Sequence, residues 1–383
     1  MHGSWSKTGS LVCLILWNTA VAGGCVRRPA AAVSTTTSWR LEASVKYDAL
    51  CLLSALSGDP YYLRYYQREY DHFHPLFLPE EQAAFAQLKH ILKDTGGGIV
   101  SATLALYYSA VDDETLADMI RTAHDSSAMK RALQTTPYWN PNAWRLYEQA
   151  APALETALRA LDRVGFTTYW TQTVKATIDA RIADLVPDLP RYDIVSAIEQ
   201  HLGFALPSHT ITIYVLAYSE PHDIRLTGMR FITNASYPFD IVLHSAIHEA
   251  MHPPYRLDDP TVRRAVMRLS TEPVIVDKVM HHDRSAGYNS ATGLIEEDSV
   301  EALEQIVSEK FGAGRYARWY WYTQDDGMHV LAPAIYVGYK DSLARNPEPY
   351  SRWLIKAIAD GQLEGNRLRS TIRKFFFFLH GAG

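Results

Sequence analysis

The chain is poor in cysteine and lacks long runs of one charge or of apolar residues. Its formal net charge is −5 and no long basic run offsets it, which argues against a nucleic-acid-binding surface. The apolar run at 11–22 and the four phenylalanines at 375–378 are too short to span a bilayer comfortably. The three cysteines, at positions 13, 25 and 51, are too few for a disulfide framework. The burial of an apolar core must therefore stabilise the fold.

The N-terminal segment is typical of an export signal. Residues 1–10 are polar, residues 11–22 are apolar, and Ala-Val-Ala at 20–22 offers small residues for cleavage by a signal peptidase. Ala-Gly-Gly-Cys at 22–25 resembles a bacterial lipobox, in which the cysteine becomes lipidated, although Ala22 stands where such boxes usually carry Leu. We therefore predict a lipoprotein-type signal peptide at 1–25 and a cell-envelope protein attached to the membrane through a lipid on Cys25. The alternative is a secreted or periplasmic soluble protein.

The rest of the chain divides into a tether and two regions. Residues 26–38 are rich in Ala, Ser, Thr and Pro, as a flexible tether is, and residues 39–203 have a helical pattern nearly throughout. Residues 209–218 and 224–233 concentrate β-branched and aromatic residues and predict two strands. Asp240 can cap a helix at 241–252 that ends before two prolines, and a further helix is expected at 294–311. The predicted fold is α+β and predominantly α-helical, with a small β-sheet in the region 204–383.

The segment His248-Glu249-Ala250-Met251-His252 carries the clearest chemistry. Positions i and i+4 lie on one face of a helix, so His248 and His252 can point their imidazoles at one metal ion. Glu249 lies about 100° further round, where it can reach a metal-bound water without binding the metal itself. Zinc lowers the pKa of such a water, and a carboxylate can take its proton as it attacks a carbonyl. The spacing is the HExxH signature of zinc hydrolases, and we expect one Zn²⁺ with Glu249 as the general base.

Residues 210–308 resemble the zincin metallopeptidases, in which a small sheet packs over the HExxH helix. In the gluzincin subclass a glutamate on a later helix is the third ligand, and an acid four residues beyond it supports the first histidine. Glu297 and Glu301 match that pattern, whereas Glu296 would place Val300 in the supporting position. The resemblance therefore implies Glu297 as the ligand and Glu301 as its support.

A second zincin pattern places a His or Asp ligand six residues after the second histidine. Asp258 occupies that position, but the glycine expected midway is Tyr255, which lacks the freedom for the required turn. Asp258 is thus the alternative third ligand, and otherwise it belongs to the N-terminal cap of a helix at 260–270. His244 lies one turn before His248 and is expected to be a packed or pocket-rim residue.

The remaining expectations concern the oxyanion and the substrate. Tyr288 precedes Glu297 by nine residues, a spacing similar to that of the transition-state tyrosine in thermolysin-like enzymes, and is the predicted oxyanion donor. Other candidates are His329, Tyr336 and Tyr255. Zincins hold extended peptides along a sheet edge, which implies residues 229–235 as the edge here.

The sequence predicts a zinc-dependent metallopeptidase that cleaves a peptide or protein substrate outside the cytoplasm. Two other classes compete with it. One is a non-catalytic envelope lipoprotein that uses a zincin-like fold for binding or scaffolding, and the other is a helical binding lipoprotein without a metal. Glu249 favours catalysis, because a residue in that position has no role in simply holding zinc.

Overall fold

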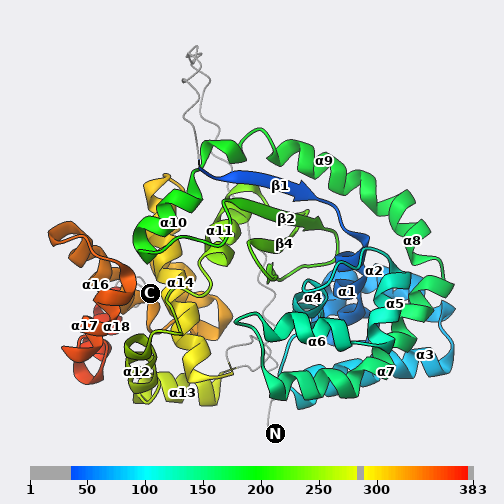
Figure 1. Cartoon of the computed structure of the whole chain (residues 1–383), viewed down its shortest axis with the longest axis horizontal. Helices are drawn as coiled ribbons and strands as arrows, with labels where there is room; N and C mark the ends of the chain where they lie inside the picture. Colours follow the sequence, from blue (N-terminus) through cyan, green and yellow to red (C-terminus); the bar gives the residue numbers. More distant parts are fainter. Residues whose placement is uncertain (1–35, 283–288, 378–383) are drawn as a thin grey trace, which may run out of the picture. The chain divides into compact units, whose positions relative to one another are not determined.

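The computed structural model describes residues 36–282 and 289–377. The predicted signal peptide, the predicted lipidation site Cys25 and most of the predicted tether lie outside this range. Helices predominate in the described residues and accompany one four-stranded sheet, which confirms the predicted α+β, mainly helical class (Figure 1). Within the described parts of the chain, no helix has the length and apolar character needed to cross a membrane.

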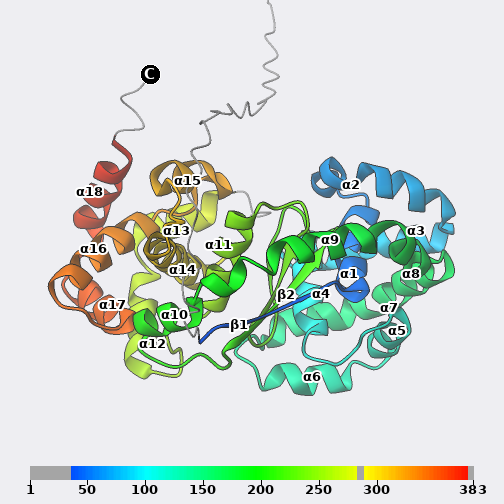
Figure 2. The ribbon, with the colours of Figure 1, turned by 90° about the horizontal axis from the view of Figure 1, so that it is seen from above.

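The helices fall into two groups on either side of the sheet (Figures 1 and 2). The first group comprises α1 (Val45–Leu56), α2 (Pro60–Phe73), α3 (Pro79–Lys89), α4 (Val100–Tyr108), α5 (Leu116–His124), α6 (Ser127–Gln134), α7 (Pro141–Arg163), α8 (Phe166–Tyr169) and α9 (Lys175–Leu185). The second comprises α10 (Ile194–Leu202), α11 (Phe239–Ala250), α12 (Pro260–Leu269), α13 (Pro273–His281), α14 (Ala291–Lys310), α15 (Ala317–Thr323), α16 (Ala332–Arg345), α17 (Tyr350–Ala359) and α18 (Gly365–Phe376).

The sheet has the strand order β1-β2-β4-β3 and mixed direction. β1 (Ser38–Glu42) and β4 (Arg230–Asn234) pair in parallel with β2 (Thr210–Leu216), and β3 (Ile224–Arg225) pairs antiparallel with β4. The strand β1 was not predicted, since its five residues are short and the pattern that follows them is helical. Because β1 joins the sheet, the start of the helical half is built into the same layer as the later strands.

The region 224–233, predicted as one strand, is a hairpin of two. Gly228, with φ +73°, lies between β3 and β4, and a positive φ is a conformation that glycine adopts easily. The hairpin places β3 at the edge and β4 inside the sheet. The prediction that residues 229–235 form the edge is therefore wrong, because the edge strands are β1 and β3.

The helices α11 and α14 carry the predicted site residues. α11 packs against β2 and β4 on one side and against α14 on the other. It begins at Phe239 after Pro238, so Asp240 lies in the first turn and is not the predicted N-cap. It ends at Ala250, which places His252 just beyond the helix and before Pro253.

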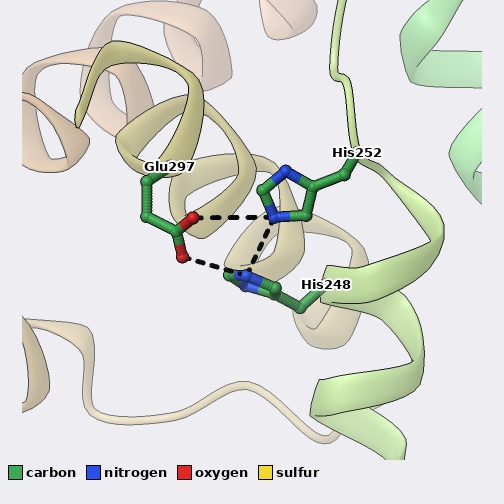
Figure 3. Close-up of side chains that lie close together, drawn as sticks. All are labelled: His248, His252 and Glu297. Carbon is green, nitrogen blue, oxygen red and sulfur yellow. Dashed lines mark hydrogen bonds and ion pairs between the residues drawn. The ribbon is translucent and has the colours of Figure 1, made fainter. Parts of the chain in front are cut away.

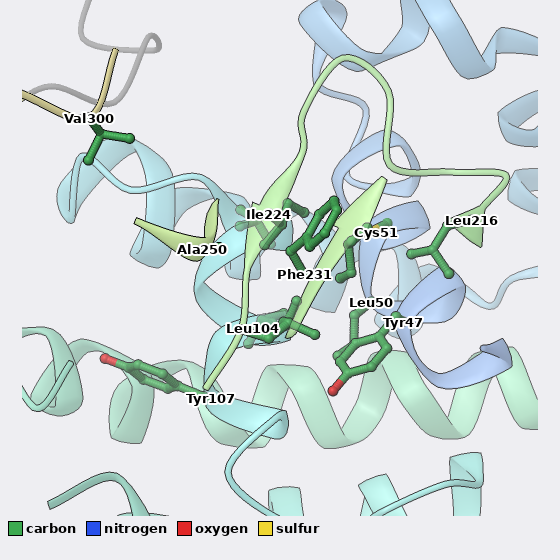
Figure 4. Packing of buried hydrophobic residues seen from close by; sticks show 14 of the residues in the cluster. Tyr47, Leu50, Cys51, Leu104, Tyr107, Leu216, Ile224, Phe231, Ala250 and Val300 are labelled. Atoms are coloured by element: carbon green, nitrogen blue, oxygen red, sulfur yellow. The ribbon is translucent and has the colours of Figure 1, made fainter. Parts of the chain in front are cut away.

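Apolar side chains from helices and strands far apart in the sequence pack into a common core around the sheet (Figure 4). The free thiol of Cys51 is buried among them, as expected of a lone structural cysteine. Members drawn from α1, α4 and the strands are Tyr47, Leu50, Cys51, Leu104, Tyr107, Leu216, Ile224 and Phe231. This shared core fixes α4 and the loops near it relative to the sheet edge, and thus relative to the site.

Candidate metal centre

The side chains of His248, His252 and Glu297 converge on one point (Figure 3). One potential ligand atom from each lies within 4.8 Å of the others. His248 Nε2 is 3.0 Å from Glu297 Oε1, and His252 Nε2 is 3.6 Å from Glu297 Oε2. The two Nε2 atoms are 3.2 Å apart. These distances are those of groups that can close around a single ion.

The donor set fits zinc. Two imidazole nitrogens and a carboxylate oxygen suit a borderline ion such as Zn²⁺, whereas Mg²⁺ and Ca²⁺ prefer sets made of oxygen alone. Three protein ligands are also the number found in catalytic zinc sites, where a fourth position is left for water or substrate. The group His248, His252 and Glu297 can therefore hold a metal ion.

Helix α14 presents its acids to α11 in a regular row. Ser290 caps the helix by accepting a hydrogen bond from Gly293 N at 3.1 Å. Glu297 and Glu301 follow one turn apart, so both face the same neighbour, while Glu296 lies on an adjacent stripe. Sequence spacing thus places two acids toward His248, and the packing of α14 on α11 brings them into contact.

Each histidine has a carboxylate on its other ring nitrogen. Glu301 Oε1 is 3.5 Å from His248 Nδ1, and Glu296 Oε1 is 3.1 Å from His252 Nδ1. The second oxygen of Glu301 accepts a hydrogen bond from Trp321 Nε1 at 2.8 Å. Carboxylates in this position orient the ring and raise its basicity. Glu301 therefore lies where the predicted support should be, and Glu296 supports the other histidine.

Replacing Glu301 with Gln is expected to weaken zinc binding by about 10–100-fold, because the ring of His248 loses its charged acceptor. The measurement is zinc affinity by competition with a chelating dye. Glu309→Gln is a matched control on the same helix, since Glu309 binds Tyr336 and Lys340 away from the site. An unchanged affinity in Glu301→Gln would show that this carboxylate does not support the metal site.

Opposite charges hold the centre together before any metal binds. Burial alone would lower the pKa of His248, but the carboxylates of Glu297, Glu249 and Glu301 outweigh it and raise this pKa to about 10. Burial likewise opposes the charge on Glu297, yet the neighbouring imidazoles lower its pKa to about 2. His248 is therefore protonated and Glu297 ionised at neutral pH, and a cation bound by this group would displace the proton of His248.

A second buried charge network lies behind the first. Glu304 accepts hydrogen bonds from Arg315 and from Ser308, and it also pairs with His244. Arg315 reaches on to Glu301 Oε2 at 3.4 Å. His244 is therefore a buried partner of Glu304 and not a metal ligand, as expected, although it also lines part of the cavity wall.

Glu249 lies at the junction of two cavities. Its side chain is buried, and its Oε2 has no hydrogen-bond partner among the residues that the structure describes. One cavity has a volume of about 290 Å³ and the other about 460 Å³, and both are lined by Glu249, His248 and Glu297. A buried carboxylate oxygen without a partner is costly, which points to a water or ligand as its natural partner. The two cavities share Glu249 and the ligands His248 and Glu297, and the rest of their lining differs.

The other predicted residues that the structure describes are not part of the converging group. The side chain of Asp258 is 68% exposed and pairs with Arg256 at 2.8 Å, so the alternative third ligand is not part of the group. Tyr336 donates to Glu309 at 2.6 Å, and His329 is buried between Asp298 and Asp325.

Of the remaining oxyanion candidates, Tyr255 is buried and does not line either cavity. Tyr288, the predicted donor, lies outside the described residues. The tyrosines that do line the cavities, as far as the chain is described, are Tyr138 and Tyr320.

Sequence reasoning missed several residues of the cavity walls. Asp223 lies in both cavities and accepts a hydrogen bond from Ser245, one turn before Glu249 on α11. Burial raises its pKa to about 7. Tyr138 and Arg225 line the larger cavity. No local pattern marks these residues, since each reaches the site through the fold and not through spacing from the histidines.

No protein-family model, no curated protein and no solved structure matches this chain.

Proposed function

We propose that this protein is a zinc metallopeptidase of the gluzincin type, acting on peptides or proteins outside the cytoplasm. One observation carries the proposal: a buried carboxylate oxygen of Glu249, without a partner among the described residues, lines the same cavities as the ligand group His248, His252 and Glu297. Such a carboxylate is not needed to hold a metal, but a hydrolase needs it as a base. Export and attachment through Cys25 rest on the N-terminal sequence alone.

Each residue of the site has a separate role in the proposed hydrolysis. Zinc held by the three ligands would supply Lewis acidity that polarises a carbonyl and makes water more acidic. Glu249 takes the proton of the attacking water and can pass it to the leaving amine. Glu301 and Glu296 hold the histidine rings in place. The two cavities accept the substrate on either side of the scissile bond.

The test is cleavage of a mixed peptide library by the purified chain, read by mass spectrometry. We expect cleavage to stop when a chelator removes the metal and to return with stoichiometric zinc, because the ligands are preformed. Zinc should also raise the melting temperature. At a free zinc concentration 100 times Kd, the free energy of unfolding should increase by about 2.7 kcal/mol. Zinc binding without cleavage of any peptide would instead support the non-catalytic envelope protein. A chain that binds no zinc would contradict both readings.

A further inference from the structure

Tyr138 brings a hydroxyl from the helical half of the chain to the metal centre. It lies in the loop between α6 and α7, where its backbone N donates to Thr136 Oγ1 at 3.3 Å and Asn140 caps α7. Its side chain lines the larger cavity together with Glu249 and His252. The loop is thus held by hydrogen bonds on both sides of Tyr138, and the Tyr138 side chain forms part of the lining of the larger cavity.

Arg225 fixes the direction of that hydroxyl. Its Nε donates to the phenol oxygen of Tyr138 at 2.9 Å, and its Nη2 donates to the backbone carbonyl of His252 at 2.7 Å. Both bonds come from one planar guanidinium, so the phenol is tied to the chain segment that carries the second metal ligand. Arginine has no acceptor, so the phenol oxygen accepts this bond and its own hydrogen is left to point elsewhere.

A phenol in this state is a neutral hydrogen-bond donor. Burial raises the pKa of Tyr138, and the nearby carboxylates of Glu249 and Glu296 add to the effect, against the opposing influence of Arg225. The hydroxyl therefore keeps its proton at neutral pH.

The other tyrosine that lines a cavity in the described residues is Tyr320. It lines the smaller cavity, and the guanidinium of Arg315 lies 3.8 Å from the centre of its ring.

We propose that Tyr138 donates a hydrogen bond to the oxyanion that forms at the scissile carbonyl, with Arg225 as its positioning residue. The inference rests on the proposed function and deepens it, because it makes the helical half part of the catalytic site. Tyr138 lines the same cavity as the three ligands and Glu249, so a scissile carbonyl held there would lie near its hydroxyl. A donor aimed at the developing negative charge lowers the barrier without tighter binding of the substrate.

The test is Tyr138→Phe in the full, zinc-loaded chain. We expect kcat to fall by about 10²–10³-fold while KM changes little, since one oxyanion donor is removed. Affinity for a phosphinic peptide, a mimic of the tetrahedral intermediate, should fall by a similar factor. Zinc content and melting temperature should stay at wild-type values, because the ring and its packing remain. Tyr336→Phe is the matched control, since that hydroxyl binds Glu309 away from both cavities.

A second variant tests the role of Arg225. Arg225→Gln should lower kcat in the wild-type background but cause little further loss in the Tyr138→Phe background, since the guanidinium acts through the phenol. Equal losses in both backgrounds would show that Arg225 has only a structural role.

If Tyr138→Phe keeps the wild-type kcat and the wild-type affinity for the inhibitor, the inference is overturned, while the proposed metallopeptidase function still stands. The same loss found in Tyr320→Phe instead would also overturn it. Absence of zinc-dependent cleavage by the wild-type chain would overturn the proposed function, and the inference with it.

Discussion

Glu249→Gln is expected to lower kcat for peptide hydrolysis by about 10²–10⁴-fold while the bound zinc is retained. Glutamine keeps the size of the side chain but cannot accept the proton of the attacking water. Glu249 is not among the three groups that converge on the metal position, so its charge is not needed to hold the ion. The measurement combines steady-state cleavage of a fluorogenic peptide with elemental analysis of the same preparation.

The control for this experiment is Glu309→Gln, which makes the same chemical change on α14, where the carboxylate binds Tyr336 and Lys340. Its activity and zinc content should equal those of the wild type. Full activity in Glu249→Gln would show that another group is the base. Loss of zinc together with activity would instead assign Glu249 a part in holding the metal.

Glu297→Ala is expected to abolish stoichiometric zinc binding, and Asp258→Ala to leave it unchanged. Glu297 is the acid within reach of both Nε2 atoms, whereas Asp258 is exposed and paired with Arg256. Loss of a supporting carboxylate costs about 10–100-fold in metal affinity, and loss of a direct ligand should exceed that. Zinc per chain after dialysis, measured by elemental analysis, separates the two variants.

Glu296→Ala completes the set, because Glu296 contacts His252 on the ring nitrogen that faces away from the other ligands. This variant should weaken zinc binding by about 10–100-fold, the loss expected when a supporting carboxylate is removed. Full zinc retention in Glu297→Ala, or complete loss in Asp258→Ala, would contradict the ligand assignment. The melting temperature without metal should stay close to the wild-type value in Asp258→Ala, since its side chain is mostly solvated.

Much of the fold class could be predicted from local pattern, but its assembly could not. The strand at Thr210–Leu216 is dense in β-branched residues, and the helix expected at 294–311 is observed at Ala291–Lys310. The strand β1 escaped prediction because a five-residue strand before a helix carries little periodic signal. The hairpin at Gly228 was taken as one strand for a similar reason, and that error put the sheet edge in the wrong place.

The sequence by itself determined the pair His248 and His252 with Glu249 between them. Their relation is local, since His248 lies in the last turn of α11 and His252 follows its C-cap Met251 directly. Tertiary structure decided between the two acids that the sequence left open, because the packing of α14 against α11 brings Glu297 to both histidines, while Asp258 is exposed and paired with Arg256. It also brought Tyr138 to Arg225, 87 positions away, since only the shared core around the sheet sets the loop before α7 against the strand β3.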